Sequence, residues 1–214
     1  MESSAPSPGR QARRKAATRR AIMEAADRLF TERGYVETTM EDIAEAADVG
    51  VRTIYLHFDG KSGILLAHFD DWLDAFVDAL RARPVDEPVP DAIAAALARM
   101  VADGWTDRSY GEMTRPHPTV QFIGDGALEI AGHIMHSWVR AQERLAADVA
   151  ERGGHSPDAL EPWSRAAEIF AAWTATILYA RDGYARGELP AGESGNTIGA
   201  RIARQVADGS ASRR

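Results

Sequence analysis

Apolar residues recur along this chain at the spacing of helix faces. Between residues 11 and 33 they fall at i, i+3, i+4, i+7 and i+8, on one side of a helix: Ile22, Ala25, Ala26, Leu29 and Phe30. Gly34 is typical of the residue that ends such a helix. A short helix is predicted over 39–47, with Thr39 as its cap and Asp42 three residues on in the pattern of a capping box. A second short helix is predicted over 51–58, followed by a longer one over 61–83 that stops at Pro84.

The rest of the chain continues with helical periodicity. We expect further helices over 91–101, 127–152, 158–186 and 197–207, and no segment alternates with period two for long enough to form a strand. The fold class is therefore predicted to be all-α. The pattern divides the chain into a disordered tail over 1–10, a three-helix domain over 11–60, a larger helical domain over 61–208 and a second disordered tail over 209–214.

Charge is distributed unevenly along the sequence. The net charge of the 214 residues is -7, yet residues 1–20 contain six basic residues against Glu2 alone. Such a basic arm can approach a polyanion, although a solvated tail without a partner fits this charge equally well. The chain contains no cysteine and no apolar run long enough to span a membrane, so we expect a cytoplasmic protein.

The first three predicted helices match the physical description of a helix-turn-helix. They occupy about 45 residues, and a tight turn over 48–50 joins the last two. In such a motif the third helix enters the major groove of DNA. Periodicity alone leaves a second interpretation open, because any small three-helix bundle has the same pattern.

The residues themselves resemble a known family over the run ATRRAIMEAADRLFTERGYVETTMEDIAEAADVGVRTIYLHFDGKSGIL. This run is similar in order and spacing to the DNA-binding domain of TetR-type regulators. The similarity includes the apolar face of the first helix, the Gly34-Tyr35 link, the core of the second helix and the Thr53-Ile54-Tyr55 segment. Three positions depart from the family pattern: Asp48 in the turn, Gly50 at the start of helix 3 and Gly60 before Lys61. Asp tolerates left-handed backbone and Gly is an acceptable N-cap, so we expect the motif to survive.

The resemblance implies binding to double-stranded operator DNA. Residues suited to clamping phosphates by hydroxyl, imidazole or ammonium donors are Thr39, Tyr55, His57 and Lys61. Arg52 and Thr53 lie in the first turn of helix 3, where they can reach base edges, and Leu56 can touch a thymine methyl group. The alternatives are a half-buried packing role for Tyr55 and a solvated surface position for His57.

The resemblance also implies a homodimer formed through the last two long helices. The first of these is apolar on more than one side, and a helix of this kind must bury both sides. The expected dimer contacts are Ile169, Trp173, Thr176, Tyr179, Ile198 and Ile202. The alternative is a central helix buried inside one monomer. Two-fold symmetry would require a pseudo-palindromic operator.

Aromatic and thioether side chains of the larger domain are of the kind that line apolar ligand pockets. The candidates are Trp105, Tyr110, Met113, Phe122, Met135, Trp138 and Trp173, although each taken singly is more often ordinary core. Glu129, His133 and His136 fall on one helix face at a spacing feasible for a divalent metal, but such a set is common by chance. We assign no metal site and no cofactor.

Other classes of function find less support in the sequence. It contains no Gly-rich phosphate loop, nucleophile elbow or HExxH motif, so an enzyme is not expected. A helical protein-interaction or small-molecule-binding protein would explain the bundle but not the phosphate donors at their observed spacing. The prediction is a ligand-responsive transcriptional repressor, released from its operator by a small apolar effector, with helix 4 as the mechanical link.

Overall fold

A computed structural model describes residues 9–105, 128–156, 158–188 and 194–211 of the chain. All the elements in these ranges are helices: α1 (Arg10–Arg33), α2 (Met40–Ala46), α3 (Val51–Tyr55), α4 (Gly60–Arg81), α5 (Val89–Ala102), α7 (Leu128–Gly153), α8 (Glu161–Arg186) and α9 (Gly195–Ala211). The predicted all-α fold is confirmed. None of the helices found there is long and apolar enough to cross a membrane.

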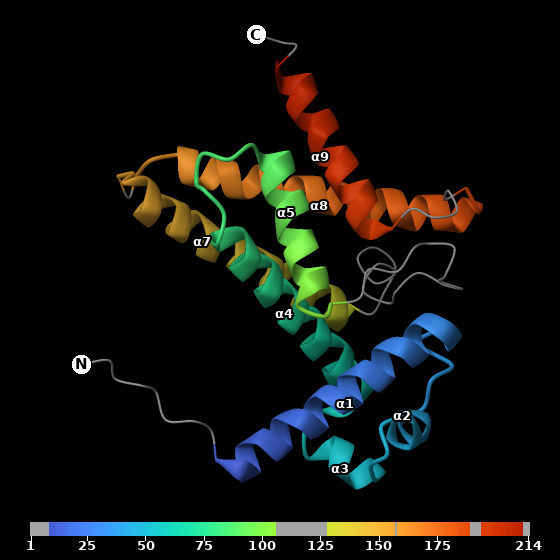
Figure 1. Cartoon of the computed structure of the whole chain (residues 1–214). Coiled ribbons are helices and arrows are strands. Elements are labelled where there is room, and N and C mark those ends of the chain that lie inside the picture. Colours follow the sequence, from blue (N-terminus) through green and yellow to red (C-terminus); the bar gives the residue numbers. More distant parts are fainter. Residues whose placement is uncertain (1–8, 106–127, 157, 189–193, 212–214) are drawn as a thin grey trace.

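Helices α1, α2 and α3 gather at one end of the molecule, as Figure 1 shows. Their apolar faces meet because Ile22, Phe30, Ile43 and Ile54 point into a shared core and are almost completely buried. The predicted face of α1 is confirmed, since all five of its apolar residues are buried. This small core fixes the orientation of α3, which is too short to be stable by itself.

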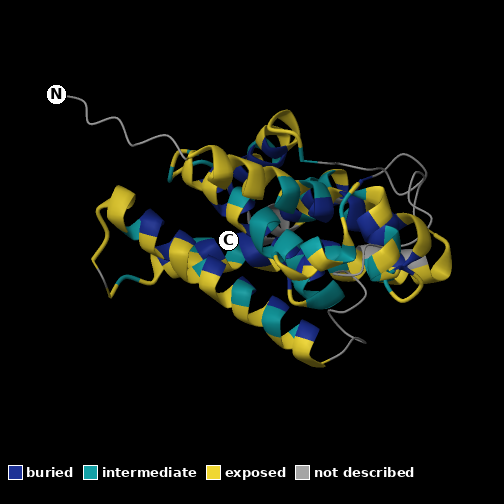
Figure 2. Cartoon of the chain, turned by 90° about the horizontal axis from the view of Figure 1, so that it is seen from below, coloured by how far each residue is buried: buried dark blue, intermediate teal, exposed yellow. Residues whose placement is uncertain are grey.

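Helix α4 leaves this end and runs into the larger helical body (Figure 1). It packs against α1 near its start and against α5 and α7 further along. One continuous set of buried apolar residues therefore extends from α1 to α9. Figure 2 shows the dark-blue buried positions facing inward between the helices of this body.

Aromatic rings fill the centre of the larger body. Trp72 of α4 stacks on Trp173 of α8 with 5.2 Å between ring centroids, and Phe76 lies 5.7 Å from the same Trp173 ring. Trp138 of α7 meets Phe170 of α8 edge to face at 5.0 Å. Because aromatic side chains bury large apolar areas, these contacts account for much of the attachment of α8 to α4 and α7.

Candidate nucleic-acid interface

Helix α2 begins with a complete capping box. The Thr39 hydroxyl accepts a hydrogen bond from the Asp42 backbone N–H at 3.1 Å, and the Thr39 backbone N–H donates to the Asp42 carboxylate at 2.9 Å. The Thr39 hydroxyl also donates to that carboxylate, and these hydrogen bonds hold the pKa of Asp42 below its usual value. The capping box predicted from the sequence is confirmed. Thr39 is exposed, but its hydroxyl proton already has an acceptor.

The turn between α2 and α3 accommodates Asp48 and Gly50, two of the residues that depart from the family pattern. Asp48 adopts a left-handed backbone with a φ of 52°, a conformation that Asp accepts more readily than most residues. Gly50 is the N-cap of α3 and offers no side-chain cap, while its carbonyl oxygen accepts the Thr53 N–H at 2.8 Å. The departures at these positions therefore leave the motif intact.

Helix α3 is anchored on one side and open on the other. Ile54 is fully buried and Phe58, just beyond the helix, is nearly so. Tyr55 and Leu56 are 59% and 72% exposed, and Arg52 is exposed as well. The exposed side of α3 is therefore available for contact with a partner.

His57 lies half-buried at the end of α3, next to Phe58, whose ring centroid is 6.3 Å away. Its Nδ1 is shielded from solvent and has no hydrogen-bond partner among the described residues. His57 is therefore not the fully solvated side chain of the alternative interpretation. Thr53 is also half-buried, beside Gly50.

Lys61, near the start of α4, turns its ammonium group into the link between α1 and α2. Its Nζ donates to the backbone carbonyl oxygens of Tyr35 at 2.6 Å, Thr38 at 2.9 Å and Val36 at 3.4 Å. It also lies 4.4 Å from the centroid of the Tyr35 ring, a favourable position for a cation. Partial burial lowers the pKa of Lys61, and the negative charge of Glu37 opposes this effect.

This geometry gives Lys61 a structural role that competes with the phosphate contact predicted for it. An ammonium group has three N–H donors, and here three carbonyl oxygens take them. The residue joins α4 to the α1–α2 link instead of reaching toward solvent. Sequence reasoning missed this contact because its partners are backbone carbonyls, which any residue type carries.

The predicted pocket residues lie in different surroundings. Trp138 and Trp173 are buried packing residues of the aromatic core, and Trp105 is half-buried with its ring 5.8 Å from His68. Met135 is 59% exposed, which corrects its assignment to the inside of a pocket. Tyr110, Met113 and Phe122 lie outside the described residues.

The predicted dimer contacts also need correction. Ile169, Trp173, Thr176 and Ile198 are buried against other helices of the same protomer and have almost no surface to offer a partner. Tyr179 is 44% exposed and Ile202 is half-buried, so both remain available. The sequence showed that α8 is apolar on two sides but not which of the two points inward.

A different set of α8 residues forms the exposed side of that helix. They recur at i, i+4, i+8, i+12, i+15 and i+16, along a ridge that winds over about 160° of the helix surface: Trp163, Ala167, Ala171, Ala175, Leu178 and Tyr179. Trp163 is 51% exposed. We call this set the α8 outer stripe.

His133 of α7, which the sequence placed in a possible metal-binding pattern, contacts a carboxylate of α4. His133 Nε2 lies 2.8 Å from the Asp70 carboxylate of α4, and the Ser137 hydroxyl donates to the same carboxylate at 2.7 Å. Among the residues that the structure describes, no group of three or more His, Asp or Glu side chains is arranged to hold a metal ion. The contact thus joins α7 to α4.

Comparison with known proteins gives a consistent result. A family model described as bacterial regulatory proteins, tetR family, matches residues 22–68. The transcriptional regulator TcmR of Streptomyces glaucescens is 29% identical over 150 residues, which is 69% of this chain and 65% of TcmR. The transcriptional repressor KstR2 of Mycobacterium tuberculosis is 29% identical over 62% of this chain and 64% of its own length. The match thus spans just under two thirds of these relatives.

Solved structures share the fold over nearly the whole chain. The fatty acid degradation regulator FadR from Bacillus halodurans has a TM-score of 0.58 at 18% identity and covers 93% of this chain and 95% of its own. FadR from Bacillus subtilis, solved in complex with stearoyl-CoA, has a TM-score of 0.55 at 16% identity and covers 89% and 98%. Residues 22–68 thus match the tetR family of bacterial regulatory proteins, and the chain shares its helical fold with these solved structures.

Proposed function

We propose that this protein is a ligand-responsive transcriptional regulator that binds operator DNA through α3. The observation that carries the proposal is the anchoring of α3 by Ile54 and Phe58, which leaves Arg52, Tyr55 and Leu56 exposed on its outer side. A short helix held by its neighbours, with a cation and an aromatic residue outward, suits insertion into a major groove. The named relatives TcmR and KstR2, a regulator and a repressor, support the same function.

The exposed residues at α3 suit two kinds of DNA contact, one with base edges and one with phosphates. Arg52 can form two parallel hydrogen bonds with a guanine edge, and Leu56 can pack on a thymine methyl group. The Tyr55 hydroxyl suits a phosphate oxygen, as does the exposed side of the α2 N-terminus at Thr39. His57 is half-buried with its Nδ1 shielded, so a contact with a phosphate at the end of α3 would have to use Nε2.

The active form in this proposal is a homodimer held through the α8 outer stripe. The stripe combines small Ala residues, which allow two helices to approach closely, with the exposed Trp163, Leu178 and Tyr179. Arg201 of α9 lies 6.0 Å from the Tyr179 ring and borders the stripe. Self-complementary packing across a two-fold axis would bury these apolar groups.

The proposed effector is a small, largely apolar molecule bound in the larger helical body. The aromatic residues between α4, α7 and α8 make that body apolar inside, and a FadR of this fold holds stearoyl-CoA. An effector releases DNA only if it binds more tightly to the conformation that fits the operator poorly.

The first test is fluorescence anisotropy with the DNA that flanks the protein's own gene, in competition with an unrelated duplex of equal length. We expect tight, sequence-selective binding that Tyr55→Ala weakens at least tenfold. Arg140→Ala, an exposed change on α7, is the control and should leave affinity unchanged. Equal affinity for both duplexes would contradict the proposal and favour a helical interaction protein without operator specificity.

A further inference from the structure

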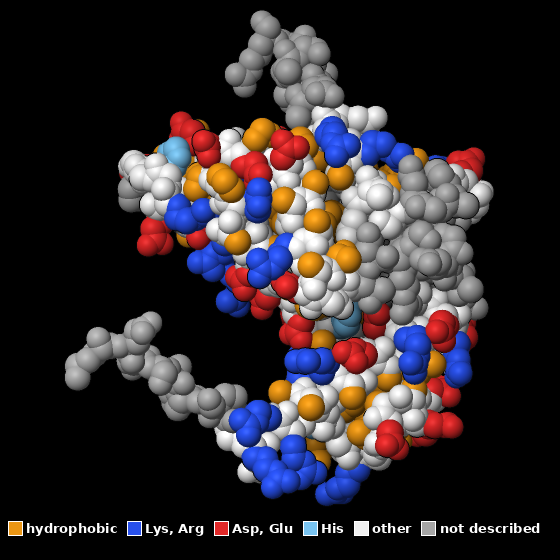
Figure 3. Space-filling view, viewed as in Figure 1, with side chains coloured by type: hydrophobic (Ala, Val, Ile, Leu, Met, Phe, Trp, Pro, Cys, Tyr) orange, Lys and Arg blue, Asp and Glu red, His pale blue; other side chains and the backbone are white. Residues whose placement is uncertain are grey.

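The first turns of α1 carry cations that no acidic side chain neutralises. The helix begins at Arg10, and no Asp or Glu occurs between that residue and Arg20. Arg10, Arg13, Arg14 and Lys15 are exposed, and the described part of the chain offers them no ion pair. Figure 3 shows Lys and Arg gathered where α1 begins, with acidic side chains further along this face. We call residues 10–20 the basic arm.

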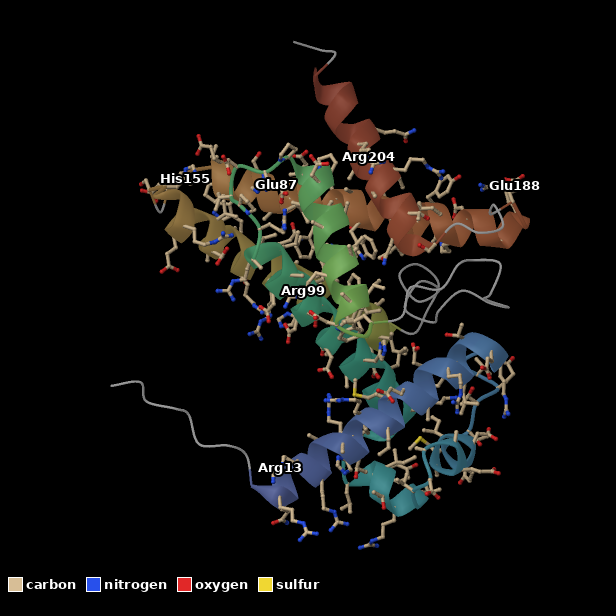
Figure 4. All side chains as sticks on the ribbon, in the orientation of Figure 1. Arg13, Glu87, Arg99, His155, Glu188 and Arg204 are labelled. Atoms are coloured by element: carbon tan, nitrogen blue, oxygen red, sulfur yellow. The ribbon has the colours of Figure 1, made fainter. Side chains whose placement is uncertain are left out.

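Three of these cations share one face of α1. Arg10, Arg13 and Arg14 follow an i, i+3, i+4 spacing, and Arg13 lies opposite the buried residue Ile22. Arg13 points away from the body at the end of the molecule that also holds α3 (Figure 4). The arm and the exposed side of α3 thus lie at one end of the molecule.

Arg19 fixes the direction of the arm relative to α3. Its guanidinium lies 5.3 Å from the Phe58 ring, just beyond α3, and its Nη1 lies 2.7 Å from the Asp71 carboxylate of α4. Both contacts are made at the root of the arm. The helix therefore leaves the helix-turn-helix core in a defined direction, as Figure 1 also shows.

The arm is electrostatically unfavourable in the free protein. Its cations occupy the first turns of a helix, where the backbone dipole already presents positive charge and favours acidic side chains. The first turn contains no acidic residue, and the N-cap Gly9 makes no side-chain cap. A bound polyanion would relieve this repulsion.

We infer that the basic arm binds the phosphate backbone of DNA outside the half-site that α3 reads. This inference rests on the proposed function and extends it to the flanking DNA. From Arg10 to Arg20 the arm is about 15 Å long, which corresponds to about four base pairs of duplex. An anionic membrane is a less suitable partner, because its flat surface would also face the acidic remainder of the chain and be repelled by it. Flanking DNA meets only the end of the molecule that carries α3.

The test uses the full-length protein and two duplexes, one ending at the operator edges and one with about ten further base pairs on each side. The variant is Arg13→Ala with Arg14→Ala, and the control is Arg140→Ala with Arg204→Ala, two exposed arginines removed from α7 and α9. Removing one cation from a phosphate lowers the slope of log affinity against log salt by about 0.9. We expect the arm variant to lower this slope by about 2 per protomer on the long duplex only.

The outcomes separate the two proposals. Wild-type protein should prefer the long duplex, the arm variant should lose that preference, and the control should keep it. An arm variant with unchanged slope and unchanged length preference overturns the arm inference while selective operator binding still stands. Absence of selectivity in the wild type overturns the proposed function itself. Loss of binding to phosphatidylserine vesicles without any change on DNA would also overturn the arm inference, in favour of a membrane contact.

Discussion

Replacing Lys61 by Met separates a structural role of this side chain from a DNA contact. Met keeps most of the length of the side chain but removes the ammonium group. The carbonyl oxygens of Tyr35 and Thr38 are then without donors at 2.6 and 2.9 Å, and the Tyr35 ring is without its cation. The link between α1 and α2 would no longer be fastened to α4.

The expected cost follows from these contacts. A hydrogen bond that involves a charged group contributes about 1.5–3 kcal/mol, and an exposed cation–π contact contributes about 0.5–1 kcal/mol. Lys61 is only partly buried, so water replaces part of this stabilisation. We therefore expect a net decrease of about 2–3 kcal/mol in the free energy of unfolding, which for a chain of this size lowers Tm by about 5–10 °C.

The assay combines thermal unfolding, followed by circular dichroism, with operator binding at several salt concentrations. Arg140→Met is the control, because Arg140 is exposed on α7 and should leave both Tm and the salt slope unchanged. Lys61→Met should lower Tm and weaken operator binding without changing its salt dependence. If Tm stays at the wild-type value while the salt slope falls by about 0.9 per protomer, Lys61 binds a phosphate and the structural reasoning is refuted.

Further predictions concern the α2 cap, α3 and α8. Thr39→Ala should cost about 1 kcal/mol of stability by urea unfolding, because the α2 cap is removed; no change would contradict the capping role. The lowered pKa of Asp42 means that its stabilising effect is present above about pH 4 and fades as pH falls further. Asp42→Asn should therefore be less stable than wild type at pH 7, with a difference that disappears in acid. Arg52→Ala should alter base preference at one operator position, and equal weakening on every operator variant would refute its base contact. Ala171→Glu in the α8 outer stripe should yield monomers in sedimentation equilibrium, whereas Arg140→Glu should not.

Local features of the helix-turn-helix could be predicted from the sequence because their partners are close in the chain. The capping box of α2 joins two residues three positions apart, and the left-handed Asp48 follows from the needs of a tight turn. The buried face of α1 follows from its apolar period. In each case the residue type and its spacing determine the contact.

The contacts between distant segments could not be predicted in the same way. Lys61 binds backbone carbonyls of a link more than twenty residues earlier, and such acceptors leave no trace in the sequence. Helix α8 is apolar on two sides, so periodicity identifies both without saying which faces the protomer core. The burial of Ile169 and Thr176, and the exposure of Ala171, settle that choice only in three dimensions.

Helix α4 is the element through which the larger body and the helix-turn-helix influence each other. Near its start it holds the α1–α2 link through Lys61. At its middle Asp71 holds the root of the basic arm, next to Trp72, which stacks on the Trp173 ring of α8. A ligand that separates Trp72 from Trp173 would displace α4 relative to α8. Because the polar contacts of Lys61 and Asp71 are short and directional, α1 and its arm must follow that shift or those hydrogen bonds must break. Arg19→Ala should therefore weaken the coupling between effector and DNA binding, measured as the ratio of operator affinities with and without effector, more than it weakens either affinity alone.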